Sequence, residues 1–332
     1  MPAEWERHAA TWLAWPHNPE TWVDCVDAAE AEYQGLVEAI AQAEPTHVLV
    51  KDAEHRAAVA ARFRGKSLPI HLHVVPTDDA WIRDTGPTFV HDGKGGLSAV
   101  DWGFNSWGGK YPPWDRDAEV AGHVARLASA RHLRATLTLE GGALEVDGEG
   151  TLLATRSSIL TPTRNPGRAV ESVEEELRQR LGVTQIVWLD AELAGDDTDG
   201  HIDNVARFVA PGRVVCARVL DPAHPNHAIL EECRATLLGS RDAHGRALEV
   251  IDLPLPPAIE VDGARLPGSY VNFLIANGRV VMPSFGVASD ARAAEILAKC
   301  LPGRDVVSVP CLTLVRGFGG PHCLSQQQPA PE

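Results

Sequence analysis

The residue most able to do covalent chemistry is Cys323, close to the end of the chain. It follows Arg316-Gly-Phe-Gly-Gly-Pro-His and precedes a run of three glutamines. Glycines at this density let the backbone bend sharply and let a ligand approach it closely. A cysteine presented by such a loop is a candidate nucleophile. The simpler interpretation is a buried small hydrophobic residue, because free cysteine is among the most buried residue types.

A nucleophile needs partners, and four polar residues recur upstream at intervals of roughly a fifth of the chain. Asp84, Glu140, His201 and Asn272 each stand at the mouth of a predicted hairpin, as Cys323 ends the series. Histidine beside a cysteine can act as general acid and base. Glutamate can hold that imidazole in the required tautomer.

Asp203 lies two residues after His201, just before the strand-like stretch 205–209. If residues 201–203 are part of that strand, both side chains point to the same face. Asp84 and Asp203 are then two carboxylates beyond those that the histidine needs. Two carboxylates suit a planar cation with several donors, such as guanidinium. The residue set therefore predicts attack of a cysteine on a guanidinium carbon.

The chain repeats a unit of strand, hairpin, helix and strand. We expect helices over 27–43, 53–63, 118–132, 170–181, 227–238 and 290–300, from their apolar spacing. We expect strands over 47–50, 68–75, 88–90, 97–102, 135–139, 143–146, 151–155, 184–189, 205–209, 214–219, 248–253, 270–275, 279–282 and 306–309. Such repetition predicts a closed radial array, which brings the five polar residues to one central site. The alternative is an α/β protein whose units do not converge. No linker divides the chain, so we expect one domain, residues 1–332.

Composition limits the partners. The net charge is −15, which argues against nucleic acid and favours small cations, although acidic charge also simply aids solubility. We find neither a signal peptide nor an apolar run long enough for a membrane span. The six cysteines lack zinc-ligand spacing, which is typical of a cytoplasmic protein with free thiols. His71 and His73 share a strand face without a third ligand in the sequence nearby, so we interpret them as structural. We expect no metal or organic cofactor, and the sequence leaves a homo-oligomer open.

Six motifs together carry a resemblance to a known family. They are Trp81-x-Arg-Asp-Thr-Gly-Pro87, Trp102-Gly-Phe-Asn-x-Trp-Gly-Gly109, Glu140-Gly-Gly142, Asp199-Gly-His-x-Asp-Asn204, Ser269-Tyr-x-Asn-Phe273 and His322-Cys-x-x-Gln-Gln-Gln-Pro329. In this order, over nearly the whole chain, they resemble the agmatine deiminases of the guanidino-group-modifying superfamily. The resemblance implies a five-bladed pseudo-symmetric α/β-propeller.

The resemblance also implies roles for individual residues. Cys323 would be the nucleophile, His201 the acid and base, and Glu140 its partner. Asp84 and Asp203 would clamp the guanidinium, and Trp81 and Asn272 would line the substrate channel. The implied reaction converts agmatine to N-carbamoylputrescine, a polyamine precursor, through a Cys-thiouronium intermediate.

The chain departs from the family pattern at four positions. Phe318, Gly320 and Pro321 replace a glycine, an asparagine and an isoleucine of the usual cysteine loop, and Asp197 stands where a glutamate is common. We expect Asp197 to receive the substrate's ammonium group, unless it only caps a turn. Two other functions remain open: a deiminase of free or peptidyl arginine, and a non-catalytic guanidine- or polyamine-binding propeller. An arginine site would need a cation for the carboxylate, for which Arg156, Arg164 and Arg207 are candidates.

Overall fold

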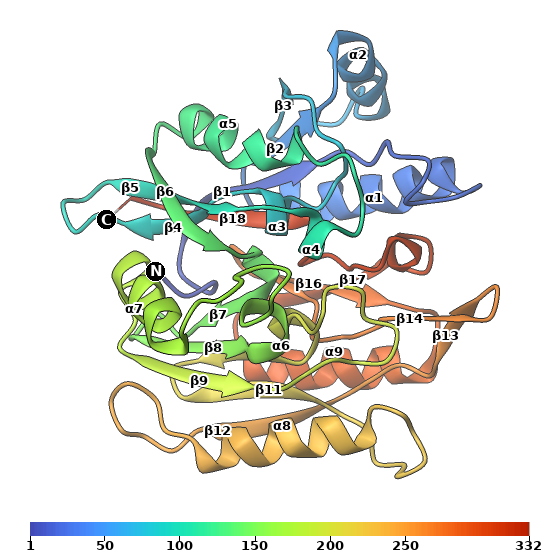
Figure 1. The fold of residues 1–332 in the computed structure, drawn as a ribbon. Helices are drawn as coiled ribbons and strands as arrows, with labels where there is room; N and C mark the ends of the chain where they lie inside the picture. Colours follow the sequence, from blue (N-terminus) through green and yellow to red (C-terminus); the bar gives the residue numbers. More distant parts are fainter. Residues whose placement is uncertain (332) are drawn as a thin grey trace.

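A computed structural model describes residues 1–331 as a mixed α/β structure built from five small mixed sheets. In four of the sheets an antiparallel hairpin is extended by a third strand that pairs parallel with the hairpin's second strand; in the fifth, the antiparallel pair joins strands from the two ends of the chain. A helix connects the hairpin to the parallel strand, as a parallel pairing requires a crossover. The principal helices lie on the outside of the sheets (Figure 1).

Four of the sheets contain consecutive strands, each with one main helix before the last strand. Their elements are β4 (Thr88–His91), β5 (Leu97–Gly103), α5 (Val120–Leu127) and β6 (Arg131–Thr138); β7 (Leu144–Val146), β8 (Thr151–Thr155), α7 (Val170–Leu181) and β9 (Gln185–Leu189); β10 (Ala206–Ala210), β11 (Arg213–Arg218), α8 (His227–Gly239) and β12 (Glu249–Pro254); and β15 (Leu274–Ala276), β16 (Arg279–Ser284), α9 (Ala288–Cys300) and β17 (Asp305–Pro310). A separate hairpin, β13 (Ile259–Val261) with β14 (Ala264–Leu266), stands between the last two units.

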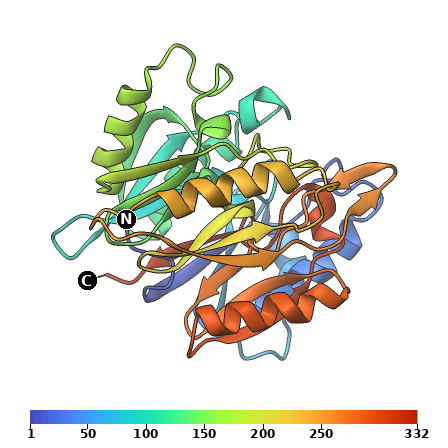
Figure 2. The ribbon, with the colours of Figure 1, turned by 90° about the horizontal axis from the view of Figure 1, so that it is seen from below.

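The fifth sheet joins the two ends of the chain. Its strand order is β18 (Ser325–Pro329), β1 (His8–Ala14), β2 (Thr46–Val50) and β3 (Ile70–Val74), with helices α1 (Val26–Ala41) and α2 (Ala53–Arg62) as crossovers. Strand β18 pairs antiparallel with β1, placing Gln327 opposite Thr11. Both ends of the chain therefore meet on one side of the molecule (Figures 1 and 2).

Local sequence accounts for most of these elements. Helix α7 buries Val173, Leu177 and Leu181, which are spaced four residues apart on one face. It ends at Gly182, whose φ of 71° is a left-handed conformation that favours glycine. Cross-strand apolar residues of the sheets and the inner faces of the helices form the core. Within residues 1–331, no helix combines the length and apolarity needed to cross a bilayer.

Two expectations about the elements were wrong, and two strands were not expected. The helix expected over 118–132 ends at Leu127, and Arg131 already belongs to β6, because Ser129 turns the chain with φ 54° and β6 pairs with β5. Residues 270–273 are not a strand; β15 begins at Leu274. The glutamine run forms β18, and residues 8–14 form β1, neither of which the sequence pattern indicated.

The expected strand at His201-Ile-Asp203 is also wrong. His201 precedes a short 3₁₀ turn, η3 (Ile202–Asn204), that contains Asp203, and β10 begins only at Ala206. Similar short turns precede β4 and β7: α3 (Ile82–Thr85) contains Asp84, and η2 (Gly141–Ala143) follows Glu140. The turns, rather than strand alternation, aim these polar side chains inward.

Candidate active site

A cavity of about 550 Å³ opens above the ends of the hairpins and reaches Cys323 and Asp84. Its walls carry several aromatic and proline side chains together with charged ones. The lining includes Trp81, Trp107, Lys110, Tyr111, Asp197 and Phe318. Glu140, His201 and Asp203 are fully buried and do not line this cavity, so they lie behind its floor.

Cys323 lies just before β18 and is held by two polar side chains. The amide of Asn272 donates to Sγ at 3.0 Å, and the thiol donates to Oδ2 of Asp203 at 3.5 Å. Burial and the nearby carboxylates of Asp203 and Asp84 raise the pKa of the Cys323 thiol well above its usual value. The thiol is therefore neutral in the empty site at neutral pH, and it needs a cation nearby to ionise.

Each ring nitrogen of His201 lies near a carboxylate. Nε2 lies 3.4 Å from Oε2 of Glu140, and Nδ1 lies 3.8 Å from Oδ1 of Asp84. Burial lowers the pKa of His201, but the charges of Asp84 and Glu140 and the hydrogen bond that Nε2 donates to Glu140 raise it to about 9. The imidazole is therefore protonated at neutral pH. Nδ1 has no hydrogen-bond partner within the described chain, so it is free to act on a ligand.

Gly142 marks the point on which three of the functional groups converge. A Cβ added there would lie 2.5 Å from Nδ1 of His201, 3.0 Å from Oδ1 of Asp84 and 3.2 Å from Oδ2 of Asp203. Only a residue without a side chain fits at position 142, so Gly142 lets the imidazole and the two carboxylates approach one another closely. Its amide also donates to Oδ1 of Asp84 at 2.9 Å.

Carboxyl groups outnumber the imidazole around Gly142, which favours the binding of a cation. Asp84, Glu140 and Asp203 are three carboxyl groups with side chains at most 3% exposed. Burial, together with the charges of Asp203 and Glu140, raises the pKa of Asp84 above its usual value. The ionised form of such a buried carboxyl group is stabilised by any cation that binds beside it. The site is thus electrostatically suited to a guanidinium group.

The structure brings together most of the predicted residues. Trp81 lines the cavity, as expected. Asn272 does not line the cavity; besides its bond to Sγ, its Oδ1 accepts from the amides of His322 and Cys323 at 3.1 and 3.3 Å. It therefore orients the nucleophile from behind.

Asp197 does reach the cavity, but its charge is shared. Its carboxylate accepts from the hydroxyl of Tyr111, and Nζ of Lys110 lies 3.7 Å from its Oδ1. Lys110 also bonds to Oδ1 of Asp199 at 2.8 Å. The predicted ammonium site is thus already part of a small ion-pair network.

The packing of the cysteine loop explains two of its glycines. A Cβ at Gly319 would lie 2.4 Å from the ring of Trp81, and one at Gly320 would lie 2.7 Å from Oδ1 of Asn272. An asparagine at 320 would collide with Asn272, so this departure from the family pattern fits its surroundings. Phe318 has a φ of 72°, a conformation that glycine adopts at lower cost. Its side chain instead forms part of the cavity wall.

Sequence reasoning missed a second layer of residues. Nε1 of Trp107 donates to Oδ2 of Asp84 at 3.0 Å. Trp107 belongs to the motif Trp102–Gly109, but the motif alone did not indicate this contact. His322 lies between Asp203 and Glu4, with Nδ1 2.8 Å and Nε2 2.9 Å from their carboxylates. No local pattern pointed to Glu4, which lies more than 300 residues away in the sequence.

Arg207, a candidate for binding a substrate carboxylate, is instead a structural residue. It is fully buried, with Nη2 2.7 Å from Oε2 of Glu4 and Nε 2.9 Å from Oε2 of Glu145. Arg156 pairs with Asp190 at 3.2 Å and does not line the cavity. Arg164 is also internal: it binds Glu140 at 2.9 Å.

Comparison with known proteins agrees with this geometry. A family model described as Porphyromonas-type peptidyl-arginine deiminase matches residues 1–329. The chain is 43% identical to agmatine deiminase of Stutzerimonas stutzeri, over 100% of this chain and 95% of the relative. It is 42% identical to agmatine deiminase of Pseudomonas aeruginosa over the same shares.

The fold also matches that of a solved structure over nearly the whole chain. Agmatine deiminase of Enterococcus faecalis superposes with a TM-score of 0.95 at 32% identity, covering 99% of this chain and 95% of that one. The chain belongs to the Porphyromonas-type peptidyl-arginine deiminase family and falls with those of its members that are named agmatine deiminase.

Proposed function

We propose that this protein hydrolyses agmatine to N-carbamoylputrescine and ammonia through a covalent intermediate on Cys323. The observation that carries the proposal is the convergence of three groups around Gly142, next to the cavity that Asp84 and Cys323 line: the His201 imidazole and the Asp84 and Asp203 carboxylates. The Cys323 thiol contacts Asp203, so a guanidinium held there lies beside the nucleophile. The similarity to agmatine deiminases over the full chain supports the same substrate.

In the first step, the guanidinium pairs with Asp84 and Asp203. Its positive charge lowers the pKa of Cys323, which the empty site holds high, and the thiol proton leaves to solvent. The thiolate adds to the central carbon. His201, protonated at neutral pH, donates a proton to one amino group, the C–N bond breaks, and ammonia departs. A thiouronium on Cys323 remains.

In the second step, the now neutral His201 removes a proton from water, and the hydroxide adds to the thiouronium carbon. The C–S bond then breaks, the electron pair returns to sulfur, and a ureido product leaves after loss of a proton. Glu140 holds the imidazole through Nε2, so that Nδ1 remains directed at the reacting atoms. Asn272 stabilises the sulfur by its amide hydrogen bond.

The cavity beyond the guanidinium favours agmatine over arginine. Trp81, Trp107 and Phe318 offer apolar surface for the methylene chain. Besides Asp84, the lining holds more half-buried or exposed carboxylates than cations: Glu20, Asp78 and Asp197 against Lys110 and Arg116. Asp79 and Asp117 also line the cavity, but burial raises the pKa of both carboxyl groups, that of Asp117 to about 8. Such a lining attracts the ammonium of agmatine and repels the carboxylate of arginine.

Two cations on the cavity wall favour arginine as the substrate: Arg116, whose Nε lies 3.9 Å from Oδ1 of Asp78, and Lys110. Lys110 is the more firmly held of the two. Its amino group is already bound to Asp199 and to the carbonyl of Asp197, at 2.8 and 2.7 Å. A substrate carboxylate would have to displace these bonds. A purely binding role, the other alternative, would leave the buried thiol and imidazole without a purpose.

We further propose that the five sheets form the blades of one pseudo-symmetric propeller, a single domain over residues 1–332. The repeated hairpin–helix–strand unit and the pairing of β18 with β1 support this arrangement. The six unpaired cysteines support a reducing, cytoplasmic compartment.

The deciding experiment measures ammonia and ureido product from agmatine, free arginine and an arginine peptide. We expect turnover of agmatine with a kcat/KM at least about 100-fold above that for arginine, as the additional carboxylate at the far end of arginine implies. Comparable values for the two substrates would refute the specificity and leave only the reaction type. A mass increase on Cys323 in acid-quenched enzyme would identify the covalent intermediate.

A further inference from the structure

We propose that Arg164 is a positioning residue of the reaction, which fixes the Glu140 carboxylate against His201 and anchors the loop that carries His201. The inference rests on the proposed function and goes beyond it, because Arg164 touches no reacting atom. It assigns a catalytic contribution to an arginine that sequence reasoning considered only as a contact for a substrate carboxylate.

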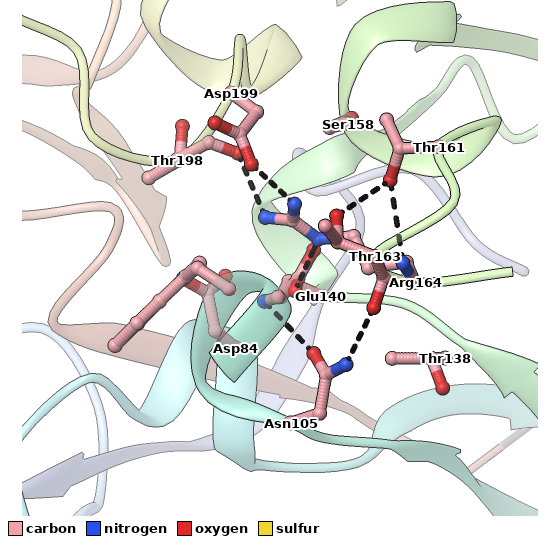
Figure 3. Close-up of polar contacts among 12 residues, drawn as sticks. Asp84, Asn105, Thr138, Glu140, Ser158, Thr161, Thr163, Arg164, Thr198 and Asp199 are labelled. Carbon is pink, nitrogen blue, oxygen red and sulfur yellow. Dashed lines mark hydrogen bonds and ion pairs between the residues drawn. The ribbon is translucent and has the colours of Figure 1, made fainter. Parts of the chain in front are cut away.

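Arg164 uses all three nitrogens of its guanidinium on the two elements that hold the acid–base pair. Nε donates to Oε1 and Oε2 of Glu140 at 2.9 and 3.2 Å. Nη2 donates to the carbonyl of Thr198 at 3.0 Å, and Nη1 bonds to the carboxylate of Asp199. Figure 3 shows this guanidinium between Glu140 on one side and Asp199 with Thr198 on the other.

The Thr198 contact leads directly to His201. The hydroxyl of Thr198 accepts from the His201 amide at 3.0 Å, and Gly200 between them has a φ of 96°. A Cβ at Gly200 would lie 2.0 Å from the carbonyl oxygen of Ala191, so this turn is packed against Ala191 and only glycine fits there. Arg164 therefore ties the backbone before His201 to the carboxylate that His201 contacts.

Arg164 itself is held rigidly. Its side chain is fully buried, and the next residue, Asn165, donates to the carbonyls of Thr138 and Ile159 at 2.8 and 2.9 Å. The amide of Asn105 donates to the carbonyl of Thr163 at 2.8 Å, on the other side of Arg164 (Figure 3). A rigid supporting group of this kind is what keeps a catalytic side chain within a narrow range of positions.

These contacts exclude a direct role in substrate binding. Arg164 is absent from the described residues that line the cavity, and each of its nitrogens already has a partner. Its loss should therefore act on the rate of the chemical steps rather than on substrate affinity.

The guanidinium also keeps Glu140 ionised. Burial raises the pKa of Glu140, but the hydrogen bond from His201 and the charge of Arg164 outweigh it, so that the pKa is lowered below its usual value. Besides Arg164, the titratable groups around Glu140 and His201 are Asp84, Asp196, Asp199, Asp203 and Cys323. Most of them are acidic, which leaves Arg164 as the cation that offsets them on the Glu140 side.

The test compares Arg164→Met and Arg164→Lys with wild type. Loss of the cation should lower kcat for agmatine by about 10- to 100-fold, the usual size for a residue that orients another functional group. KM should change by less than about threefold. The acid limb of kcat should move to higher pH in Arg164→Met, because the pKa of Glu140 rises and its ionised form is lost sooner on acidification. The pH dependence of kcat reports pKa values of the enzyme–substrate complex, in which the Asp84 carboxylate is paired with the substrate guanidinium.

Arg164→Lys should keep the acid limb near wild type while kcat falls, since lysine keeps the charge but cannot span Glu140 and Thr198 together. The matched control is Arg168→Met, four residues away, where the arginine binds Glu176 and Thr136 instead. It should leave kcat and the pH profile unchanged. Urea unfolding of each variant confirms that the fold is intact.

A double-mutant cycle with Glu140→Gln decides whether Arg164 acts through Glu140. If it does, Arg164→Met should cost much less in the Glu140→Gln background than in wild type. The proposal is overturned if the two losses multiply, if the acid limb stays in place in Arg164→Met, or if its kcat remains within about threefold of wild type.

A second readout separates this proposal from the proposed function. The carboxyl carbon of Glu140, followed by NMR against pH, should titrate at higher pH in Arg164→Met than in wild type and Arg168→Met. This measurement needs no turnover. If wild type processes no guanidino substrate, the proposed function fails, whereas an unchanged Glu140 titration contradicts the role of Arg164.

Discussion

At the scale of single residues, the site is defined by a thiol and an imidazole whose protonation states suit opposite tasks. Burial with Asp203 and Asp84 nearby raises the pKa of Cys323, while the carboxylates around His201 raise its pKa to about 9. The empty site thus holds a neutral nucleophile and a charged acid. Only a bound cation completes the activation, which links substrate recognition to chemistry.

Cys323→Ser should abolish turnover but keep most of the substrate affinity. The carboxylates of Asp84 and Asp203 provide the binding, whereas serine is a far weaker nucleophile without a base to deprotonate it. We expect kcat to fall by about 10⁴-fold or more. Ammonia release measures the rate and calorimetry measures agmatine binding. Activity within about tenfold of wild type would remove Cys323 from its assigned role.

Gly142→Ala tests whether the guanidinium binds where His201, Asp84 and Asp203 converge around residue 142. The backbone there accepts alanine, since Gly142 is not among the positive-φ residues, but the new methyl would lie 2.5 Å from Nδ1 of His201. Crowding of this kind costs about 1–3 kcal/mol, or roughly 5- to 150-fold in agmatine affinity. Gly35→Ala is the matched control, because a Cβ at Gly35 in helix α1 meets nothing within 4 Å. Unchanged affinity in Gly142→Ala would place the guanidinium elsewhere.

The pH dependence tests the role of His201. Because its pKa is raised to about 9, the acidic form is present below that pH and is lost above it. The basic limb of kcat/KM should therefore fall near pH 9. In Glu140→Gln one of the charges that raises the pKa is removed, so the limb should move to lower pH. A limb that stays in place in this variant would show that another group controls it.

Glu140→Gln should reduce kcat more than agmatine binding, while Asp84→Asn and Asp203→Asn should damage both. An asparagine amide cannot neutralise the cation and turns a donor toward its N–H groups. Steady-state kinetics with calorimetry separates the two patterns. Equal loss of binding in Glu140→Gln and Asp84→Asn would contradict the division of roles.

At the scale of elements, short turns before the first strand of a hairpin present the functional side chains. The turns α3, η2 and η3 place Asp84, Glu140 and Asp203 at the centre, and the cysteine loop does the same before β18. Loops between the elements form much of the cavity wall, and the cysteine loop contributes Phe318 to it as well as Cys323. The proposed catalytic groups and the cavity wall therefore share segments of the chain.

Asp197, on such a loop, should affect agmatine and not arginine. Asp197→Ala removes an anion from the cavity wall and should raise KM for agmatine by about fivefold, the size of a partly exposed ion pair. The weak arginine rate should stay constant or improve, since Lys110 then loses one partner. Glu192→Ala, an exposed carboxylate that does not line the cavity, serves as the control. A parallel loss for both substrates would assign Asp197 to the structure of the loop.

At the scale of the whole molecule, buried charges tie the chain ends to the site. Glu4 lies 2.9 Å from Nε2 of His322 and 2.7 Å from Nη2 of Arg207, and its Oε1 accepts from the amide of Ile275 at 2.7 Å. His322 in turn bonds to Asp203. A residue near the N-terminus therefore supports the turn that carries Asp203, one of the two carboxylates proposed to bind the guanidinium.

Glu4→Gln should destabilise the fold by about 3–5 kcal/mol, because it leaves buried cations without their counter-charge. Burial raises the pKa of Glu4, but Arg207 and His322 lower it well below its usual value. Its stabilisation is thus present above the unfolded pKa of about 4.5 and is lost as the pH falls through the folded pKa. Urea unfolding against pH measures this, with exposed Glu6→Gln as the control. A loss below about 1 kcal/mol would show that the network is dispensable.

The sequence by itself determined the parts of this protein that depend on neighbouring residues. Helix α7 with its stop at Gly182 and the hairpin of β7 and β8 follow from local periodicity and turn residues. The repeated units and the regular recurrence of Asp84, Glu140, His201, Asn272 and Cys323 indicated one centre, and the motifs indicated the family. These features need no knowledge of distant contacts, since backbone preference and side-chain spacing already encode them.

Only the tertiary structure decided what depends on contacts between distant segments. Strand β18 is a polar glutamine run without apolar alternation, and it becomes a strand because β1 supplies its hydrogen bonds. His201 and Asp203 meet through a 3₁₀ turn instead of a strand, because Glu140, Asp84 and His322 hold them in place. The pKa values of Cys323 and His201, and the link from Arg164 to Glu140, arise from burial and from charges brought together across the fold. A single sequence does not show these distances, which decide the strength of each interaction.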